Sequence, residues 1–113
     1  MSETLREKQS RFMRMLPGLI NKALEMGYEL TEGDGYRDPR VFGAIGVKLG
    51  YGHAKSCHKL RLAIDLNLFK DGKFLEGTES HKPLGEWWES QGGYWGGRFN
   101  DGNHYSLEHE GMK

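Results

Sequence analysis

Ser56-Cys-His-Lys-Leu-Arg-Leu-Ala-Ile-Asp-Leu-Asn-Leu-Phe69 is the stretch around which the rest of the chain is organised. From residue 62 onward its side chains alternate in character, which is typical of a half-buried β-strand. One face carries Leu62, Ile64, Leu66 and Leu68, and the other carries Ala63, Asp65, Asn67 and Phe69. The first face is apolar core, and the second presents a carboxylate that either meets water or lines a site.

Histidine and aspartate residues around this strand suggest a metal site. His58 lies just upstream of Asp65, and an imidazole and a carboxylate placed in this way can share a zinc ion. Downstream, Asp101-Gly-Asn-His104-Tyr-Ser-Leu begins a second alternating run with His104 and Ser106 on one face. Three ligands and one further carboxylate are the minimum for a hydrolytic zinc centre, because the carboxylate accepts a proton from water.

These residues form a recognisable pattern. Ser56-x-His58-x-x-x-x-Ala63-x-Asp65 followed by Asp101-x-x-His104 resembles the zinc signature of the D-alanyl-D-alanine carboxypeptidase and L-alanyl-D-glutamate peptidase family. The sequence around both motifs, including Trp95-Gly-Gly-Arg-Phe, is similar to that of the phage and prophage endolysins of that family. Arg61 stands where many cellular members carry glycine, which favours an endopeptidase over a carboxypeptidase.

The resemblance implies a peptidoglycan hydrolase with one zinc ion per chain. It implies that the enzyme cleaves the stem peptide at its L-Ala–D-Glu bond and that its role is lysis of a bacterial host. The implied roles are His58, Asp65 and His104 as metal ligands, Asp101 as the catalytic base, Arg37 as the oxyanion-binding residue, and Ser56 and Trp95 as substrate-binding residues. The alternatives are a D-alanyl-D-alanine carboxypeptidase and a zinc-containing cell-wall binding module without activity.

Length and composition fit a single small domain. We expect one α+β catalytic domain over residues 1–113, an antiparallel sheet packed against helices, and the resemblance implies the D-Ala-D-Ala peptidase and hedgehog-like fold. Hydrophobic residues make up 36% of the chain and there are 17 glycines, so much of it is expected to be loop. Cys57 is the single cysteine, which excludes an internal disulfide.

Charge and hydropathy limit the partners. The formal net charge is zero, yet residues 37–61 hold six Lys and Arg against one Asp. This basic stretch forms an ordinary solvated surface, or it attracts an anionic polymer. Nucleic-acid binding is not expected, because aromatic residues are not interleaved with the basic ones. No apolar run is long enough for a membrane anchor, and no signal peptide is recognised. We expect a monomer that stays in the bacterial host cytoplasm until a partner such as a holin releases it to the wall.

The remaining elements follow from periodicity and from glycine and proline. We expect a helix over residues 3–27, kinked or divided at Pro17, then a strand from Tyr28 into a glycine turn. A short helix from Pro39 precedes a loop that contains His53. Residues 70–73 predict a hairpin turn. A second helix is expected from Leu84 to Ser90, with His81 in the polar connection before it and only one of Trp87 and Trp88 facing the core.

Three residues have open or rejected alternatives. Arg37 points into the cleft or pairs on the surface with a neighbouring aspartate. Trp95 forms a wall of the substrate groove or packs as a lid over the core. Cys57 is not expected to act as a thiol nucleophile, because its neighbour His58 points away from it on an extended segment.

Overall fold

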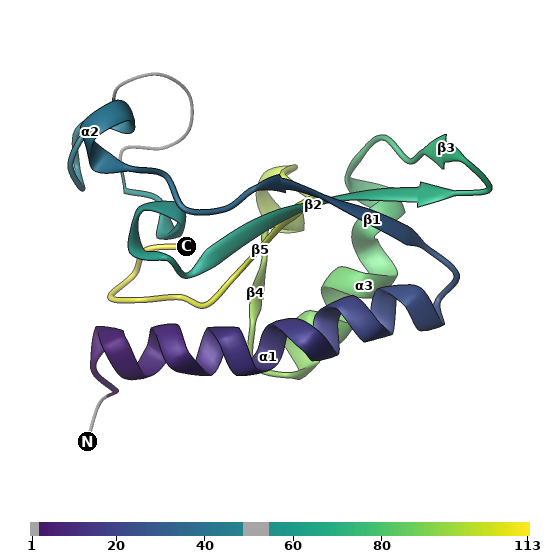
Figure 1. The fold of residues 1–113 in the computed structure, drawn as a ribbon, viewed down its shortest axis with the longest axis horizontal. Coiled ribbons are helices and arrows are strands. Elements are labelled where there is room, and N and C mark those ends of the chain that lie inside the picture. Colours follow the sequence, from purple (N-terminus) through teal and green to yellow (C-terminus); the bar gives the residue numbers. More distant parts are fainter. Residues whose placement is uncertain (1–2, 49–54) are drawn as a thin grey trace.

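The computed structural model describes residues 3–48 and 55–113 as an α+β fold, which confirms the expected class (Figure 1). The elements in chain order are α1 (Leu5–Glu25), β1 (Glu29–Asp34), α2 (Pro39–Phe42), the 3₁₀ helix η1 (Cys57–Leu60), β2 (Ala63–Lys70), β3 (Lys73–Phe74), α3 (Thr78–Ser90), β4 (Tyr94–Trp95), the 3₁₀ helix η2 (Gly96–Phe99) and β5 (His104–Ser106). Among these helices none is long and apolar enough to cross a membrane.

The sheet is antiparallel and has the organising strand at its centre. Its strand order is β1-β2-β5-β4, and β3 pairs with the far end of β2. β2 therefore has neighbours on both sides, and seven of its eight residues are buried or half-buried. The predicted hairpin turn is confirmed: Asp71 and Gly72 have φ of 52° and 77°, the left-handed pair that a two-residue hairpin loop requires.

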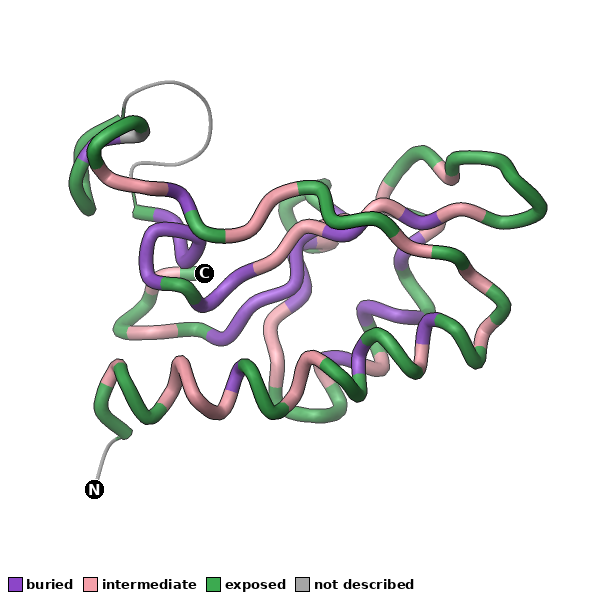
Figure 2. The backbone as a smooth tube through the Cα atoms, in the orientation of Figure 1, coloured by how far each residue is buried: buried purple, intermediate pink, exposed green. Residues whose placement is uncertain are grey.

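The core lies between the sheet and two helices. α1 runs along one face of the sheet, and the buried positions in Figure 2 concentrate where the strands and helices meet. Leu62, Leu66 and Leu68 of the organising stretch are almost inaccessible, as the alternation predicts. Trp88 joins this core at 0% exposure while Trp87 is half-buried, so the expectation that only one of the two tryptophans faces the core is confirmed.

α1 is a single helix that includes Pro17. A capping box begins it: the Thr4 hydroxyl accepts from the backbone N–H of Glu7, and the Glu7 carboxylate accepts from the N–H of Thr4. Pro17 is exposed, so the carbonyl that lacks its partner can bind water instead. The division of this segment into two helices, one of the two expectations, is therefore not seen.

α3 begins earlier than expected, and this corrects the position of His81. The helix starts at Thr78, so Pro83 lies inside it and His81 belongs to its buried face. His81 Nδ1 lies 2.8 Å from the Tyr105 hydroxyl, a contact that fixes the first turns against β5. Proline near the start of a helix removes only one backbone hydrogen bond, and tertiary packing outweighs that loss here.

The segment after β1 matches a short helix followed by a loop. Asp38 caps α2 by accepting from the backbone N–H of Arg40, and Pro39 occupies its first turn. His53 lies outside the described residues.

Candidate metal centre

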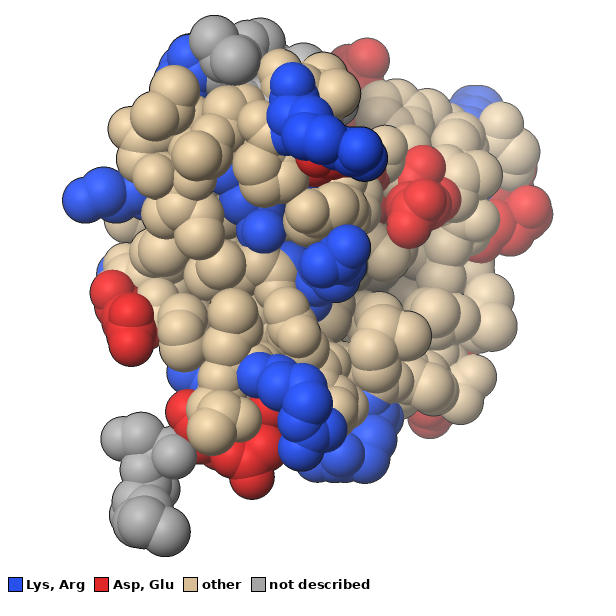
Figure 3. Space-filling view, turned by 60° about the vertical axis from the view of Figure 1, so that its left-hand side comes forward, with Lys and Arg blue, Asp and Glu red and all other residues tan. Residues whose placement is uncertain are grey.

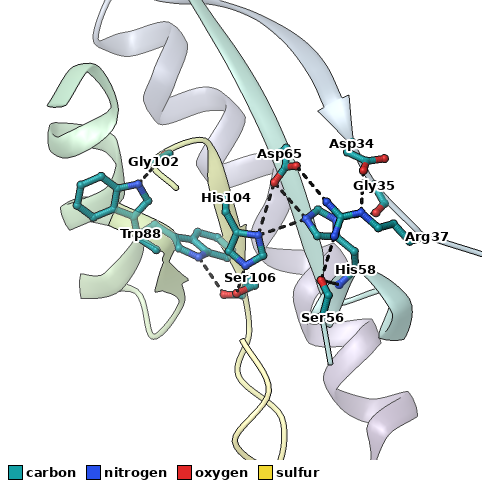
Figure 4. A network of polar contacts seen from close by, with 11 residues as sticks. Asp34, Gly35, Arg37, Ser56, His58, Asp65, Trp88, Gly102, His104 and Ser106 are labelled. Carbon is teal, nitrogen blue, oxygen red and sulfur yellow. Dashed lines mark hydrogen bonds and ion pairs between the residues drawn. The ribbon is translucent and has the colours of Figure 1, made fainter. Parts of the chain in front are cut away.

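Three side chains converge beside the central strand. His58 Nε2 lies 3.1 Å from Asp65 Oδ1 and 3.2 Å from His104 Nδ1, and His104 Nδ1 lies 3.5 Å from Asp65 Oδ1. Figure 4 shows the three groups pointing toward one another. The structure thus brings together all three residues expected from the sequence to hold a metal ion.

Backbone pairing places two of these residues. Asp65 on β2 and His104 on β5 are direct register partners, so their side chains leave the same face of the sheet. His58 comes from η1, immediately before β2, and the Ser56 hydroxyl caps η1 by accepting from the N–H of His58. Local capping and strand register together bring the three donors to one point.

A hydrogen bond to the other ring nitrogen orients each imidazole. His58 Nδ1 lies 2.7 Å from the Gly35 carbonyl oxygen, to which it can only donate, so Nε2 is left to face Asp65. His104 Nε2 lies 3.1 Å from the Ser106 hydroxyl, which leaves Nδ1 facing the same point. Such partners fix the tautomer and direction of metal-binding histidines.

The electrostatics of the site keep Asp65 ionised. Burial alone raises the pKa of this carboxyl group, but hydrogen bonds from His104 and His58 and the charge of these rings lower it to about 2. An ionised carboxylate with two imidazole nitrogens is a ligand set with one negative charge.

The donor geometry fits zinc. A tetrahedral ion with bonds of about 2.0–2.1 Å separates its ligand atoms by about 3.3 Å. The three measured separations of 3.1, 3.2 and 3.5 Å lie around that value. Calcium and magnesium favour all-oxygen ligand sets, so two imidazoles select against them. The residues present therefore suit a zinc ion with one position left for water or substrate.

Arg37 lies beside this group and combines both of its expected environments. It is 8% exposed, its Nε donates to Asp34 Oδ2 at 2.9 Å, and its Nη2 lies 3.8 Å from Asp65 Oδ2. Its Nη1 also donates to the Ser56 hydroxyl at 3.3 Å. Arg37 is thus paired with a neighbouring aspartate, yet it lies in the site and not on the surface. Ser56 is 4% exposed and serves as cap and acceptor; its contact with substrate stays a prediction.

Asp101 lies in the loop before β5, outside the three-residue group. Its backbone carbonyl accepts from the N–H of His104 at 3.1 Å, and its own N–H donates to Gly96 at 3.0 Å. The Asp101 side chain is exposed to solvent. The backbone of this residue therefore helps to place a metal ligand, while its carboxylate is available to water.

Trp95 packs into the core and supports the same loop. It is 7% exposed, and its indole N–H donates to the Gly102 carbonyl at 2.7 Å. Its ring fills the space beside Gly85 and Gly97, where an added Cβ would come within 2.1 and 2.3 Å of it. This is the core-lid alternative, and a direct contact between Trp95 and substrate stays a prediction.

Arg61 has a backbone conformation that favours glycine. It has φ of 58° and ends η1 in the left-handed region, which glycine adopts without cost. Its guanidinium carbon lies 3.9 Å from the centroid of the Tyr36 ring, and this stacking offsets part of the strain. The Arg61 side chain is exposed to solvent.

Two groups that orient the histidines of the metal centre were not predicted from the sequence. The Gly35 carbonyl is a backbone group, which no side-chain pattern reveals. Ser106 as partner of His104 was recoverable, because the two residues alternate onto the same strand face.

A family model described as D-alanyl-D-alanine carboxypeptidase matches residues 50–107, half of the chain, and spans all three candidate ligands together with Asp101. The chain belongs to this family. Its members are zinc peptidases, which agrees with the donor geometry of the metal centre. No curated protein matches the chain.

Proposed function

We propose that this member of the D-alanyl-D-alanine carboxypeptidase family is a zinc endopeptidase that cleaves the stem peptide of peptidoglycan at its L-Ala–D-Glu bond, as an endolysin. The observation that carries the proposal is the convergence of His58, Asp65 and His104 with separations suited to tetrahedral zinc. A zinc ion held there supplies Lewis acidity and lets water ionise near pH 7.

The chain's own residues then have separate tasks. The exposed Asp101 carboxylate accepts a proton from the attacking water and delivers it to the leaving amine. The Arg37 guanidinium, held by Asp34 and Ser56, stabilises negative charge that develops on the carbonyl oxygen. The fixed contacts of both imidazoles keep the ligands in place without reorganisation.

The surface beside the site favours an anionic polymer. Figure 3 looks toward the end of the molecule that carries α2 and η1, and Lys and Arg side chains stand across the middle of this face. Arg40, Lys55 and Arg61 are exposed members of the basic stretch predicted from the sequence. A positive surface raises the encounter rate with the carboxylates of wall peptides.

The biological setting belongs to the same proposal. The enzyme acts as a monomer, accumulates in the bacterial host cytoplasm and reaches the wall when a holin opens the membrane. Its role is lysis of the host by a bacteriophage or prophage.

Digestion of purified peptidoglycan with zinc-loaded protein, followed by mass analysis of the fragments, tests the function. New amino termini on glutamate are the expected result. Released D-alanine would instead identify a carboxypeptidase, the activity that the family description names. Intact wall with one bound zinc per chain would favour the binding module.

A further inference from the structure

A hollow of about 240 Å³ opens beside Asp101, and we call it the Asp101 hollow. Its walls come from the loop before β5, the first turn of α3 and the β2–β3 hairpin. The residues that matter for its chemistry are Asn67, Phe74, Glu76, Thr78, Asn100 and Asp101. His58, Asp65 and His104 do not line it, so it is a separate compartment next to the metal centre.

The hollow continues the site along the sheet. Asn67 follows Asp65 by two positions on β2, so both side chains leave the same face of the strand. Arg37 lies toward η1, where it donates to Ser56. With Arg37 at the carbonyl oxygen and Asp101 at the leaving amine, the leaving half of a substrate begins at the Asp101 hollow.

The charge of the hollow is negative. Glu76 and Asp101 bring two carboxylates, Asn67 and Asn100 add amide groups, and no Lys or Arg is among the described residues that line it. His81 at its inner wall adds no positive charge near neutral pH, because burial lowers the pKa of this imidazole to about 4. A cleft with one sign of charge concentrates ligands of the opposite sign.

The walls are held in place before any ligand arrives. The Thr78 hydroxyl donates to Asn100 Oδ1 at 3.1 Å and accepts from the N–H of Gly102 at 3.2 Å. A Cβ on Gly102 would lie 2.5 Å from Thr78 Cα, so the loop and the helix start are in direct backbone contact. Such preorganisation lowers the entropic cost of binding.

The volume of the hollow and its apolar wall limit further the kind of ligand that it can bind. The volume is below the roughly 300–1,000 Å³ of pockets for whole small molecules, which suits one side chain. Phe74 is 51% exposed and its ring packs against Phe69 at 5.5 Å between centroids. It offers an apolar surface for a methylene chain and a ring face for a cation.

We propose that the Asp101 hollow binds an aminoalkyl side chain, one that ends in a primary ammonium group, on the leaving half of the substrate peptide. The proposal rests on the proposed peptidase function and adds a substrate preference to it.

Two synthetic peptides test this preference: L-alanyl-γ-D-glutamyl-L-lysine and the same peptide with norleucine in place of lysine. They differ at the terminal amine. Wild-type enzyme is expected to cleave the lysine peptide with a kcat/KM about fivefold higher, mainly through KM, because the Glu76 carboxylate pairs with the ammonium group while Asp101 handles the proton. Glu76→Gln should lose most of this advantage. Glu79→Gln is the matched control, since Glu79 is an exposed acid in the first turn of α3, three residues after Glu76, and does not line the hollow.

Equal cleavage of both peptides by wild type, or an unchanged preference in Glu76→Gln, would overturn the hollow proposal and leave the peptidase function intact. Cleavage of neither peptide by fully zinc-loaded protein would overturn the proposed function instead. Binding of both peptides is therefore also measured by calorimetric titration of the zinc-loaded protein. Tighter lysine-peptide binding that disappears in Glu76→Gln supports the hollow without turnover, and equal binding overturns it.

Discussion

Asp65 and His104 are register partners in the antiparallel pair β2–β5, and Asp65 Oδ1 lies 3.5 Å from His104 Nδ1. Two of the three candidate ligands are therefore fixed by the hydrogen bonding of the central strands. The third, His58, depends on the cap that Ser56 provides to η1. Loss of metal affinity and loss of fold should consequently be separable, because ligand side chains can be removed without breaking the strand pairing.

Removal of a ligand imidazole should abolish zinc binding. His58→Ala and His104→Ala are each expected to carry much less than one equivalent of zinc and to lose hydrolysis, because two ligands hold zinc poorly. Their melting temperatures should fall below that of the zinc-loaded wild type. They should lie close to the melting temperature of wild type measured in the presence of a chelator. Metal analysis and thermal melting measure both effects. His109→Ala, outside the group, is the control and should keep its zinc; full zinc in either ligand variant would contradict the site.

Ser106→Ala tests the orienting contact of His104. The serine hydroxyl lies 3.1 Å from His104 Nε2 and is fully buried, so its loss frees the ring to rotate. Zinc affinity should fall about 10–100-fold, as is typical when such a partner is removed, while saturating zinc restores full occupancy. Competition with a chromophoric chelator measures the affinity. Ser90→Ala, on the exposed end of α3, should leave it unchanged.

Arg37→Ala should lower turnover about 10²–10³-fold, the usual loss for one oxyanion donor, and leave zinc bound. Arg37→Lys should recover only part of the rate because the planar fork is lost. The partly buried ion pair with Asp34 makes some loss of stability expected in Arg37→Ala, so the rate is measured on folded, zinc-replete protein. Near-wild-type turnover in that preparation would leave Arg37 a purely structural role.

The parts of the fold that short-range patterns control were predictable. Alternation from Leu62 to Phe69 predicted the central strand, and the positions of His58 and Asp65 around its start indicated two members of the group that could hold a metal ion. The pairing of Asp65 with His104 also follows, once both runs are read as neighbouring strands.

The predictions that were wrong or left alternatives open concern positions that tertiary contacts decide. Pro83 suggested that α3 begins after it, whereas the contact of His81 with Tyr105 extends the helix back to Thr78. Trp95 left two alternatives open because one residue's polarity does not reveal what its ring packs against; the close approach of Gly97 and the bond to Gly102 decide its position.

His81 should make stability depend on pH. Burial lowers the pKa of this imidazole from 6.5 to about 4. Between these values the unfolded chain binds a proton that the folded protein does not, so stability is complete above about pH 6.5 and declines as pH falls toward 4. Wild type should therefore lose about 2 kcal/mol more between pH 7 and 5 than His81→Gln, whose amide does not titrate. Urea unfolding at both pH values measures the difference, in which the losses from other groups cancel. Equal losses would contradict a neutral, buried His81.

Asp101→Asn separates metal binding from chemistry. The backbone of Asp101 positions His104 through a hydrogen bond of 3.1 Å, and asparagine keeps that backbone bond. The side chain belongs to no described metal group, so zinc content and melting temperature should match those of wild type. An amide cannot accept the proton of the attacking water, and wall hydrolysis should drop 10²-fold or more.

Two outcomes of the Asp101→Asn experiment would change the assignment. Loss of zinc would make Asp101 a ligand and leave Asp65 as a possible base, although the low pKa of Asp65 and its contacts with both imidazoles favour its role as ligand. Unchanged hydrolysis with zinc retained would place the base elsewhere. Glu108→Gln is then the next variant, because Glu108 is an exposed acid two residues beyond β5, on the strand face predicted to carry His104.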